Sequence, residues 1–290
     1  MPKQTALLRT LPSGRRVLLQ GLRRRRWHDL YHVFMTATWP RLFASFAGFF
    51  VLFNLIFAAA YSLQANGIAD LNPPGFWGRF FFSVETLATV GYGDMHPQTI
   101  FTHVVASVEI FTGMMSLALI AGMMFARFSR PTARFLFARH AVIRSVDGET
   151  TLLLRAANER QNVVMEARAQ LRLIRDERSA DGYHLRRIHD LRLRRSEHPV
   201  FLFGWTLMHT IDATSPLAGA SAESLEASNA SLWLTLSGTD ETTGQLLMAQ
   251  HEYVVSMLRW EHRFVDILTP SEDGIDRLDY TRFHDVEPLG

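Results

Sequence analysis

The chain has 290 residues, of which 48% are hydrophobic, and it contains no cysteine, so it can form neither a disulfide nor a thiolate metal site. Its formal net charge is only +2, which does not indicate a nucleic-acid-binding protein. The apolar residues concentrate in the first half, whereas the second half is charged and alternating, so we expect about two domains.

Residues 1–26 show no sustained hydrophobic period, and we expect a flexible N-terminal tail. They lack a short apolar core followed by a cleavage site of small residues, which argues against a signal peptide. The tail ends in four consecutive arginines at positions 23–26. Taken alone, this run fits a solvated charged surface as well as contact with anionic headgroups.

Residues 27–38 have the pattern of a short amphipathic helix. The apolar positions at helical spacing are Trp27, Leu30, Tyr31, Phe34 and Met35. Tryptophan at one end, with arginines before it, is typical of a helix that lies in the membrane interface, and Pro40 breaks the run. We expect an interfacial slide helix over residues 27–38, and the alternative is a helix packed on protein.

The first transmembrane helix is expected over residues 41–63. No charged residue occurs between Leu42 and Ala69, and about 20 apolar residues are enough to cross the hydrocarbon core. Arg41 marks its inner end, and Tyr61 anchors its outer end.

A glycine- and proline-rich loop over residues 66–78 follows, and then a short apolar segment over residues 79–88. This segment is too short to span a membrane, so we expect a re-entrant pore helix buried in protein. Its C-terminal end would direct partial negative charge towards the next residues and favour a cation there.

Residues 89–94, with the sequence Thr-Val-Gly-Tyr-Gly-Asp, come directly after that helix. Glycine tolerates positive φ, so alternation with Gly91 and Gly93 can turn successive carbonyls towards one axis and replace the water shell of a potassium ion. One chain supplies one oxygen per layer, which implies a homotetramer. The expected K⁺ ligands, and the only metal site, are Thr89, Val90, Gly91, Tyr92 and Gly93. The alternative is a glycine-rich turn between two anchor helices.

Glu85 and Asp94 bracket this filter. A short helix followed by a returning strand brings such positions together, and two carboxylates in a dry site cannot both ionise cheaply. We therefore expect them to support the filter, and a shared proton is one way in which they can lie close together. The alternative is that Asp94 only caps the outer mouth.

The second transmembrane helix is expected over residues 99–127, within a pore domain of residues 39–130. Glu109 interrupts its outer half, and a charge at that depth normally faces protein or water. Gly113 and Gly122 are candidate hinges, or small residues at a helix crossing.

Basic residues cluster after the second span, at Arg127, Arg130 and Arg134. The loop between the spans contains only Arg79, so the positive-inside rule predicts a multi-pass protein of the cell (inner) membrane with both termini cytoplasmic. The three clustered arginines are the expected contacts with anionic lipids such as phosphoinositides.

The C-terminal half is expected to contain a linker, residues 131–149, and an all-β immunoglobulin-like sandwich, residues 150–290. Alternation such as Leu232, Leu234 and Leu236 with polar neighbours is typical of antiparallel strands. No nucleotide fingerprint, catalytic motif or histidine spacing suited to a metal is present, so we expect neither an enzyme nor a cofactor.

Residues 89–94 resemble the potassium-channel signature filter, and residues 127–131 resemble the basic exit of the second helix in inward-rectifier potassium channels. Further stretches that resemble that family's cytoplasmic domain begin at Arg155, His209, Gly238 and Tyr280. The resemblance covers nearly the whole chain after residue 25 and is closest to the bacterial inward-rectifier homologues.

The resemblance also implies roles for single residues. Leu117 falls at the rectification-control position, where an apolar residue implies weak block by Mg²⁺ or polyamines. Phe125 falls at the gate formed by the inner helix bundle, although lipid or helix contact is an alternative. Glu166 falls in the cytoplasmic vestibule, or is simply solvated. Eukaryotic members usually carry a basic residue where this chain has Met95, which argues against their Glu–Arg brace.

Together these features predict a homotetrameric potassium-selective channel of inward-rectifier type, gated at the inner helix bundle. Anionic lipids and the cytoplasmic domain are its expected modulators, and Mg²⁺, Ba²⁺ and polyamines are candidate blockers. The alternative is a membrane-anchored sensor or partner-binding protein with a non-conducting pore.

Overall fold

The computed structural model describes residues 7–10, 16–19, 30–160, 162–269 and 275–290. The chain divides into two compact units, Arg23–Arg130 in one and Met1–Leu22 with Pro131–Gly290 in the other. Residues 27–29 of the expected slide helix, and most of the expected N-terminal tail, lie outside the described residues.

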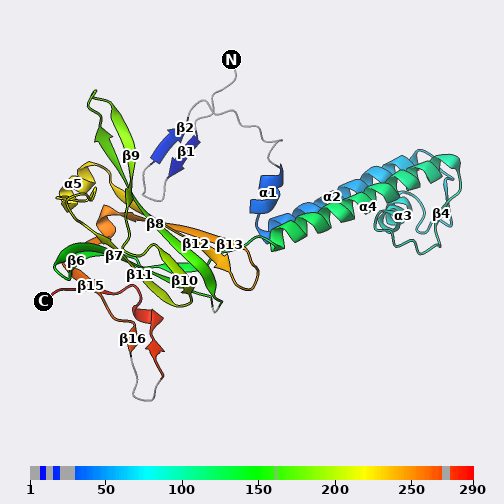
Figure 1. Ribbon diagram of the computed structural model, residues 1–290. Helices are drawn as coiled ribbons and strands as arrows, with labels where there is room; N and C mark the ends of the chain where they lie inside the picture. The colour runs from blue at the N-terminus through cyan, green and yellow to red at the C-terminus, as the bar shows by residue number, and fades with distance from the viewer. Residues whose placement is uncertain (1–6, 11–15, 20–29, 161, 270–274) are drawn as a thin grey trace. The chain divides into compact units, whose positions relative to one another are not determined.

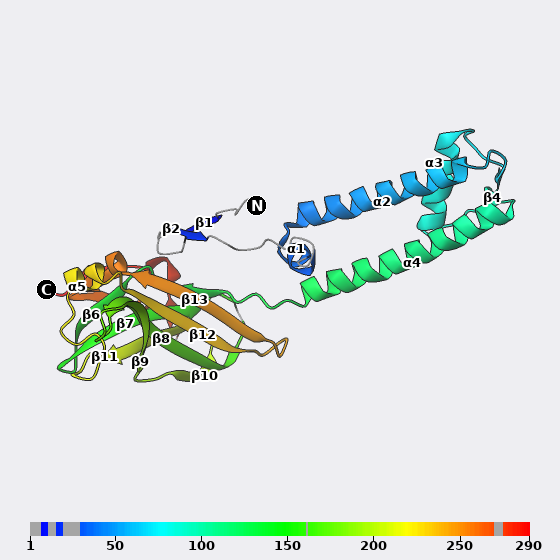
Figure 2. The same cartoon turned by 90° about the horizontal axis from the view of Figure 1, so that it is seen from above.

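In its described part, the first unit is helical. Its helices are α1 (Leu30–Thr36), α2 (Trp39–Ser62), α3 (Phe76–Leu87) and α4 (Ile100–Phe128). α2 and α4 run side by side, and α3 lies at the end of this pair that is remote from α1 (Figure 1, Figure 2). Among the described residues, α2 and α4 are the two helices long and apolar enough to cross a membrane, with mean hydropathies of 2.2 and 1.9.

Local sequence signals place the helix ends. Pro40 stands in the first turn of α2, where the missing N–H costs no hydrogen bond. Thr99 caps α4 by a reciprocal pair of hydrogen bonds with Thr102. α3 begins at Phe76, three residues before the expected start, because the chain turns at Gly75 with a φ of 85° and is helical directly afterwards. The two-residue strands β3 (Ile68–Ala69) and β4 (His96–Pro97) pair across the loops that flank α3.

The second unit is an all-β sandwich built from two five-stranded sheets. One has the order β10-β8-β12-β13 with β9 paired to β8, and the other has the order β11-β7-β6-β14 with β5 paired to β7. The strands are β5 (Phe135–Phe137), β6 (Ala141–Val146), β7 (Glu149–Asn158), β8 (Val164–Arg178), β9 (His184–Leu191), β10 (Glu197–Phe201), β11 (Gly204–Thr210), β12 (Ser231–Asp240), β13 (Leu246–Val254) and β14 (Leu258–Trp260).

Smaller elements complete the unit. They are the helix α5 (Ala222–Ala227), the one-turn 3₁₀ segments Val255–Met257 and Tyr280–Arg282, and three strand pairs: β1 (Leu7–Thr10) with β2 (Arg16–Leu19), β15 (His262–Phe264) with β18 (Val286–Pro288), and β16 (Leu268–Thr269) with β17 (Arg277–Leu278).

Leucines that alternate along the strands form the core of the sandwich. Leu232, Leu234 and Leu236 of β12 are at most 2% exposed, and they belong to the same cluster as Leu152 and Leu154 of β7 in the other sheet. Because successive side chains of a strand point to opposite faces, this period of two buries one face and leaves the other polar. The all-β fold expected for the C-terminal half is therefore confirmed.

Two expected boundaries differ from the structure. The segment 131–149 is not a linker, because β5 and β6 both pair with β7, and Ala141 and Ile143 are buried. The apolar runs of β5 and β6 are too short to show a period of two, and neighbouring arginines interrupt the hydrophobic pattern. In the tail, β1 and β2 pair in antiparallel register where we expected no regular structure, because strands of four residues carry too weak a pattern.

One interaction in the sandwich predicts that its stability depends on pH. The His251 ring stacks on Phe137 at 5.3 Å between centroids and meets Tyr253 edge-on at 4.5 Å, so β13 is joined to β5 of the other sheet. Burial lowers the pKa of His251, although Glu252 partly opposes this effect. A histidine with a lowered pKa is held neutral, so its contribution is present above the unfolded value of about 6.5 and is lost as the pH falls.

We therefore predict that the apparent Tm of the full chain falls on acidification from pH 7.5 to 5, and that His251→Gln makes this fall smaller. His184→Gln, an exposed residue of β9, is the matched control. Thermal unfolding followed by tryptophan fluorescence measures both. An equal pH dependence in wild type and His251→Gln would contradict the assignment.

Candidate functional site

The backbone of residues 89–93 alternates between positive and negative φ. Thr89, Gly91 and Gly93 have φ values of 56°, 55° and 87°, whereas Val90 and Tyr92 between them do not have positive φ. A regular alternation of left-handed and right-handed residues turns successive carbonyls to the same side of the chain. The segment is thus a row of oxygens that can face an ion.

Thr89 is the member of this row that the sequence did not single out as left-handed. A non-glycine residue in that region costs about 1–3 kcal/mol, so it persists only where its surroundings impose it. Its signal in the sequence is its spacing of two residues from Gly91, with Gly93 two further on.

The end of α3 imposes this conformation. The N–H groups of Val90 and Gly91 both donate to the backbone carbonyl of Glu85, at 2.9 and 3.3 Å, and the N–H of Thr89 donates to the Thr86 carbonyl at 3.1 Å. The start of the row is therefore a continuation of the last turn of α3. The partial negative charge at that helix end faces the same place, which favours a cation.

The two carboxylates that bracket the row are Glu85, in the last turn of α3, and Asp94, directly after Gly93, and their charges interact. Met95, the next residue, is only 6% exposed and packs with Tyr61 and Phe82 in an apolar cluster. The position after Asp94 is therefore part of a hydrophobic contact and not of an ion pair.

Of the two candidate hinge glycines, only Gly113 lies in a tight contact. A Cβ at Gly113 would meet the backbone oxygen of Leu87, the last residue of α3, at 2.1 Å. A Cβ at Gly122 would meet nothing within 4 Å. The absent side chain at Gly113 thus lets α4 approach the end of α3.

Leu117 and Phe125 are exposed on α4, at 66% and 75%. Leu117 and Thr89 line the same apolar cavity of about 510 Å³, between α2, α4 and the end of α3. Phe125 is not among the residues that line this cavity. Leu117 thus lies in the same cavity as the first residue of the carbonyl row, and Phe125 lies outside that cavity.

The basic residues after α4 have different surroundings. The Arg127 guanidinium donates to the carbonyls of Phe34 and Ala37, at 3.0 and 2.5 Å, and lies 4.3 Å from the Trp39 ring centroid. It therefore satisfies carbonyls at the end of α1, which have no partner within the helix. Arg130 is exposed and makes one long contact, 3.5 Å to the Met35 carbonyl. Arg134 is exposed in the other unit.

Glu166 is exposed on β8 with a φ of 49°, at the place where the pairing of β8 with β12 shifts between Ser237 and Thr239. Such a β-bulge re-aims a side chain relative to the strand. The alternation of the sequence could not reveal this, because it assumes a regular strand.

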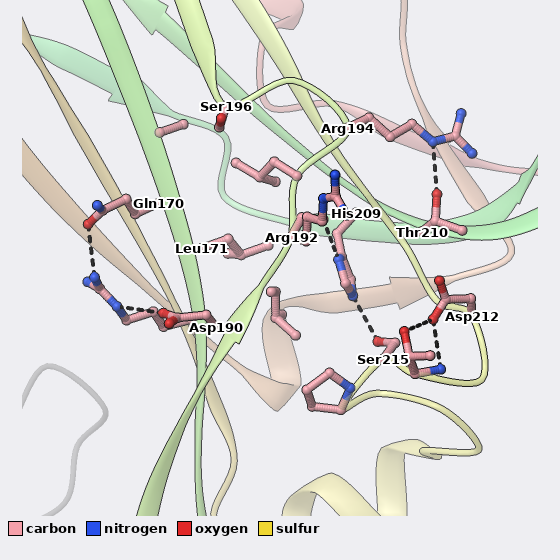
Figure 3. A pocket seen from close by; sticks show the side chains of 16 residues that line it. Gln170, Leu171, Asp190, Arg192, Arg194, Ser196, His209, Thr210, Asp212 and Ser215 are labelled. Carbon is pink, nitrogen blue, oxygen red and sulfur yellow. Dashed lines mark hydrogen bonds and ion pairs between the residues drawn. The ribbon is translucent and has the colours of Figure 1, made fainter.

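Sequence reasoning also missed a polar pocket of about 860 Å³ beside β8, β9 and β11 (Figure 3). Within it, His209 Nδ1 donates to the Arg192 carbonyl, and His209 Nε2 accepts from the Ser215 hydroxyl, both at 2.8 Å. Asp212 bonds Thr214 and not His209, so these residues do not form a catalytic triad. Among the described residues, no cluster of His, Asp and Glu could hold a metal ion.

The close approach of α4 to α3 gives a testable prediction. Gly113→Ala should lower the stability of the full chain by about 1–3 kcal/mol, because the new methyl group overlaps the Leu87 carbonyl. Gly122→Ala, on the same helix, should be neutral or stabilising by about 1 kcal/mol, since alanine is the better helix former. Thermal unfolding in detergent compares the two variants, and equal shifts would refute the contact.

Comparison with known proteins gives two family matches. Residues 135–289 match the inward rectifier potassium channel C-terminal domain, and residues 48–130 match the family model described as ion channel. The first match covers the sandwich, and the second covers most of α2 together with α3, the carbonyl row and α4.

Whole-chain relatives agree with these matches. The inward rectifier potassium channel Kirbac3.1 of Paramagnetospirillum magnetotacticum is 38% identical, over 92% of this chain and 90% of that protein. The G protein-activated inward rectifier potassium channel 3 of Mus musculus is 31% identical, over 89% of this chain and 71% of that protein. With its two apolar helices, carbonyl row and all-β sandwich, the chain belongs to the inward rectifier potassium channel family.

Proposed function

We propose that the protein is a channel that passes K⁺ selectively and passively across the cell membrane. The observation that carries this proposal is the alternating backbone of residues 89–93, held by the Glu85 carbonyl. Carbonyl oxygens in such a row can replace the hydration shell of the ion, with the Thr89 hydroxyl as the last ligand. Glu85 and Asp94 support the filter from behind.

The working unit in this proposal is a homotetramer. One chain offers a single carbonyl per layer, and several are needed to surround an ion. Large apolar side chains along α4, such as Phe111 and Leu117, are 65% and 66% exposed, which suits contact with lipid or with another copy. A tetramer is also consistent with the family.

In this channel, four copies of Phe125 form the gate, which closes the pore by dewetting. Leu117 gives weak rectification, because an apolar residue does not attract Mg²⁺ or polyamines at the membrane site. Glu166 lines the cytoplasmic vestibule and supplies the negative charge that concentrates cations there.

Anionic lipids, including phosphoinositides, modulate the channel through exposed arginines near the membrane. Arg130 and Arg134 are the direct lipid contacts, because both are exposed. Arg127 is placed differently, since its guanidinium is bonded to carbonyls at the end of α1, and it couples the interfacial helix to α4. Both termini are cytoplasmic, since the basic residues gather after the second span.

The alternative function is a membrane-anchored sensor with a closed pore. The polar pocket beside β9 favours it as a place for a soluble ligand (Figure 3). Ion flux separates the two functions.

Purified protein in liposomes should take up Rb⁺, should be blocked by Ba²⁺ and should exclude Na⁺. Gly91→Ala should abolish uptake, because alanine at a φ of 55° is strained by about 1–2 kcal/mol and displaces the filter carbonyls. Gly48→Ala in α2, where a Cβ meets nothing within 4 Å, is the matched control. Uptake insensitive to Ba²⁺, or equal passage of Na⁺, would reject the channel.

For the lipid contacts, we predict that Arg130→Gln with Arg134→Gln reduces the change in Rb⁺ uptake that phosphoinositide produces, whichever sign this change has. Arg127→Gln should alter uptake even without phosphoinositide, because it frees the end of α1. Arg195→Gln, an exposed residue beside β10, is the control. An undiminished lipid response in the double variant would eliminate these two residues as lipid contacts.

A further inference from the structure

Four polar side chains lie fully buried between the three main helices of the membrane unit. They are Asn54 and Tyr61 of α2, Ser83 of α3 and Glu109 of α4, each 0% exposed. The Tyr61 hydroxyl donates to Glu109 Oε2 at 2.6 Å. Ser83 Oγ lies within hydrogen-bonding distance of both Glu109 Oε1 and, at 2.9 Å, Asn54 Oδ1. This cluster is the polar tie between α2, α3 and α4.

The orientation of the Asn54 amide is fixed by its other contact. Asn54 Nδ2 donates to the backbone carbonyl of Phe50 at 2.7 Å. A carbonyl can only accept, so the amide cannot be turned round without setting two oxygens against each other. Asn54 therefore presents its oxygen to Ser83, and Ser83 lies between two oxygen atoms.

The number of hydrogen atoms available in the cluster then determines the protonation state of Glu109. The cluster has three oxygen–oxygen contacts: Tyr61 with Glu109, Ser83 with Glu109, and Ser83 with Asn54. Tyr61 and Ser83 carry one hydroxyl hydrogen each, and the Asn54 hydrogens face away. The third hydrogen must come from Glu109. The complete chain runs from Glu109 Oε1–H to Ser83 Oγ and from Ser83 to Asn54 Oδ1, while Tyr61 donates to Glu109 Oε2.

The surroundings agree with a neutral acid. No arginine or histidine among the described residues forms an ion pair with Glu109. Arg79, one turn before Ser83 on α3, donates instead to the Ala65 carbonyl at 3.2 Å, and Glu85 lies two residues after Ser83 on another side of that helix. Tyr61 is the titratable side chain that faces Glu109 from α2. An ionised carboxylate buried without a cation is strongly disfavoured.

We propose that Glu109 is protonated in the folded protein and, as a hydrogen-bond donor, positions the pore helix α3 through Ser83. Ser83 lies two residues before Glu85, whose backbone carbonyl holds the N–H groups of Val90 and Gly91. A displacement of Ser83 therefore moves the anchor of the filter. Glu109 is a positioning residue, and its link to conduction rests on the proposed channel function.

Glu109→Gln is the informative substitution, because a neutral amide supplies the same donor to Ser83 and the same acceptor to Tyr61. We expect it to keep Ba²⁺-sensitive Rb⁺ uptake and the apparent Tm. Glu109→Asp, which is one methylene shorter and leaves buried groups unpaired, should reduce uptake about tenfold and lower the Tm. At alkaline pH, wild type should lose uptake and stability before Glu109→Gln does. The same loss in both would overturn the proposal.

Infrared spectroscopy tests the proton directly and does not need conduction. Full-length protein in lipid vesicles, labelled with ¹³C-glutamate, should show the carbonyl band of a protonated carboxyl at neutral pH. Glu109→Gln should remove the component of this band that comes from Glu109, whereas Glu85→Gln should leave that component unchanged. A spectrum without a band that depends on Glu109 would overturn the proposal even if the channel conducts. A band that depends on Glu109, found in protein that does not pass Rb⁺, would support the protonation of Glu109 and reject the channel function.

Discussion

The structure depends on holding one short piece of backbone in a conformation that it would not adopt alone. Three left-handed residues at spacing two are needed to align the carbonyls, and one of them, Thr89, is not glycine. The stabilisation comes from outside the segment, since two consecutive N–H groups share the carbonyl of Glu85 at the end of α3. The position of α3 is in turn fixed by α4, which approaches it at Gly113. Helices α3 and α4 thus hold the peptide groups of residues 89–93 in place.

The helices that hold this segment contact one another through polar side chains, at a depth where apolar contacts are expected in a membrane protein. In a region without water, unpaired hydrogen-bonding groups are costly, so polar side chains are tolerated there when they satisfy one another. Tyr61, Ser83 and Glu109 do so across three helices. Their contacts specify one arrangement of the helices, because a shift of any helix leaves a buried donor or acceptor unpaired. Apolar packing alone would allow the helices to slide or rotate with less penalty.

The sequence predicted what depends on local patterns. Span length located α2 and α4, the glycines located the carbonyl row, and alternation located β12 and indicated an all-β C-terminal half. What it could not predict are contacts between distant positions, such as Tyr61 with Glu109, which are 48 residues apart, or Gly113 against the Leu87 carbonyl. The expected linker over residues 131–149 failed for the same reason. Strands as short as β5 are recognisable only by the strand with which they pair.

Arginines that look alike in the sequence have different tasks in the structure. Arg127 and Arg130 are three residues apart, and their charge pattern alone suggests one basic patch. A guanidinium offers five N–H groups in a rigid plane, so a single arginine can satisfy several carbonyls and still stack on a ring. Arg127 does this with the end of α1 and Trp39. Its charge is therefore partly used within the protein, whereas the Arg130 side chain is exposed. The two arginines differ because carbonyls at the end of α1 lie within reach of Arg127. The charge pattern of the sequence contains no information about those carbonyls.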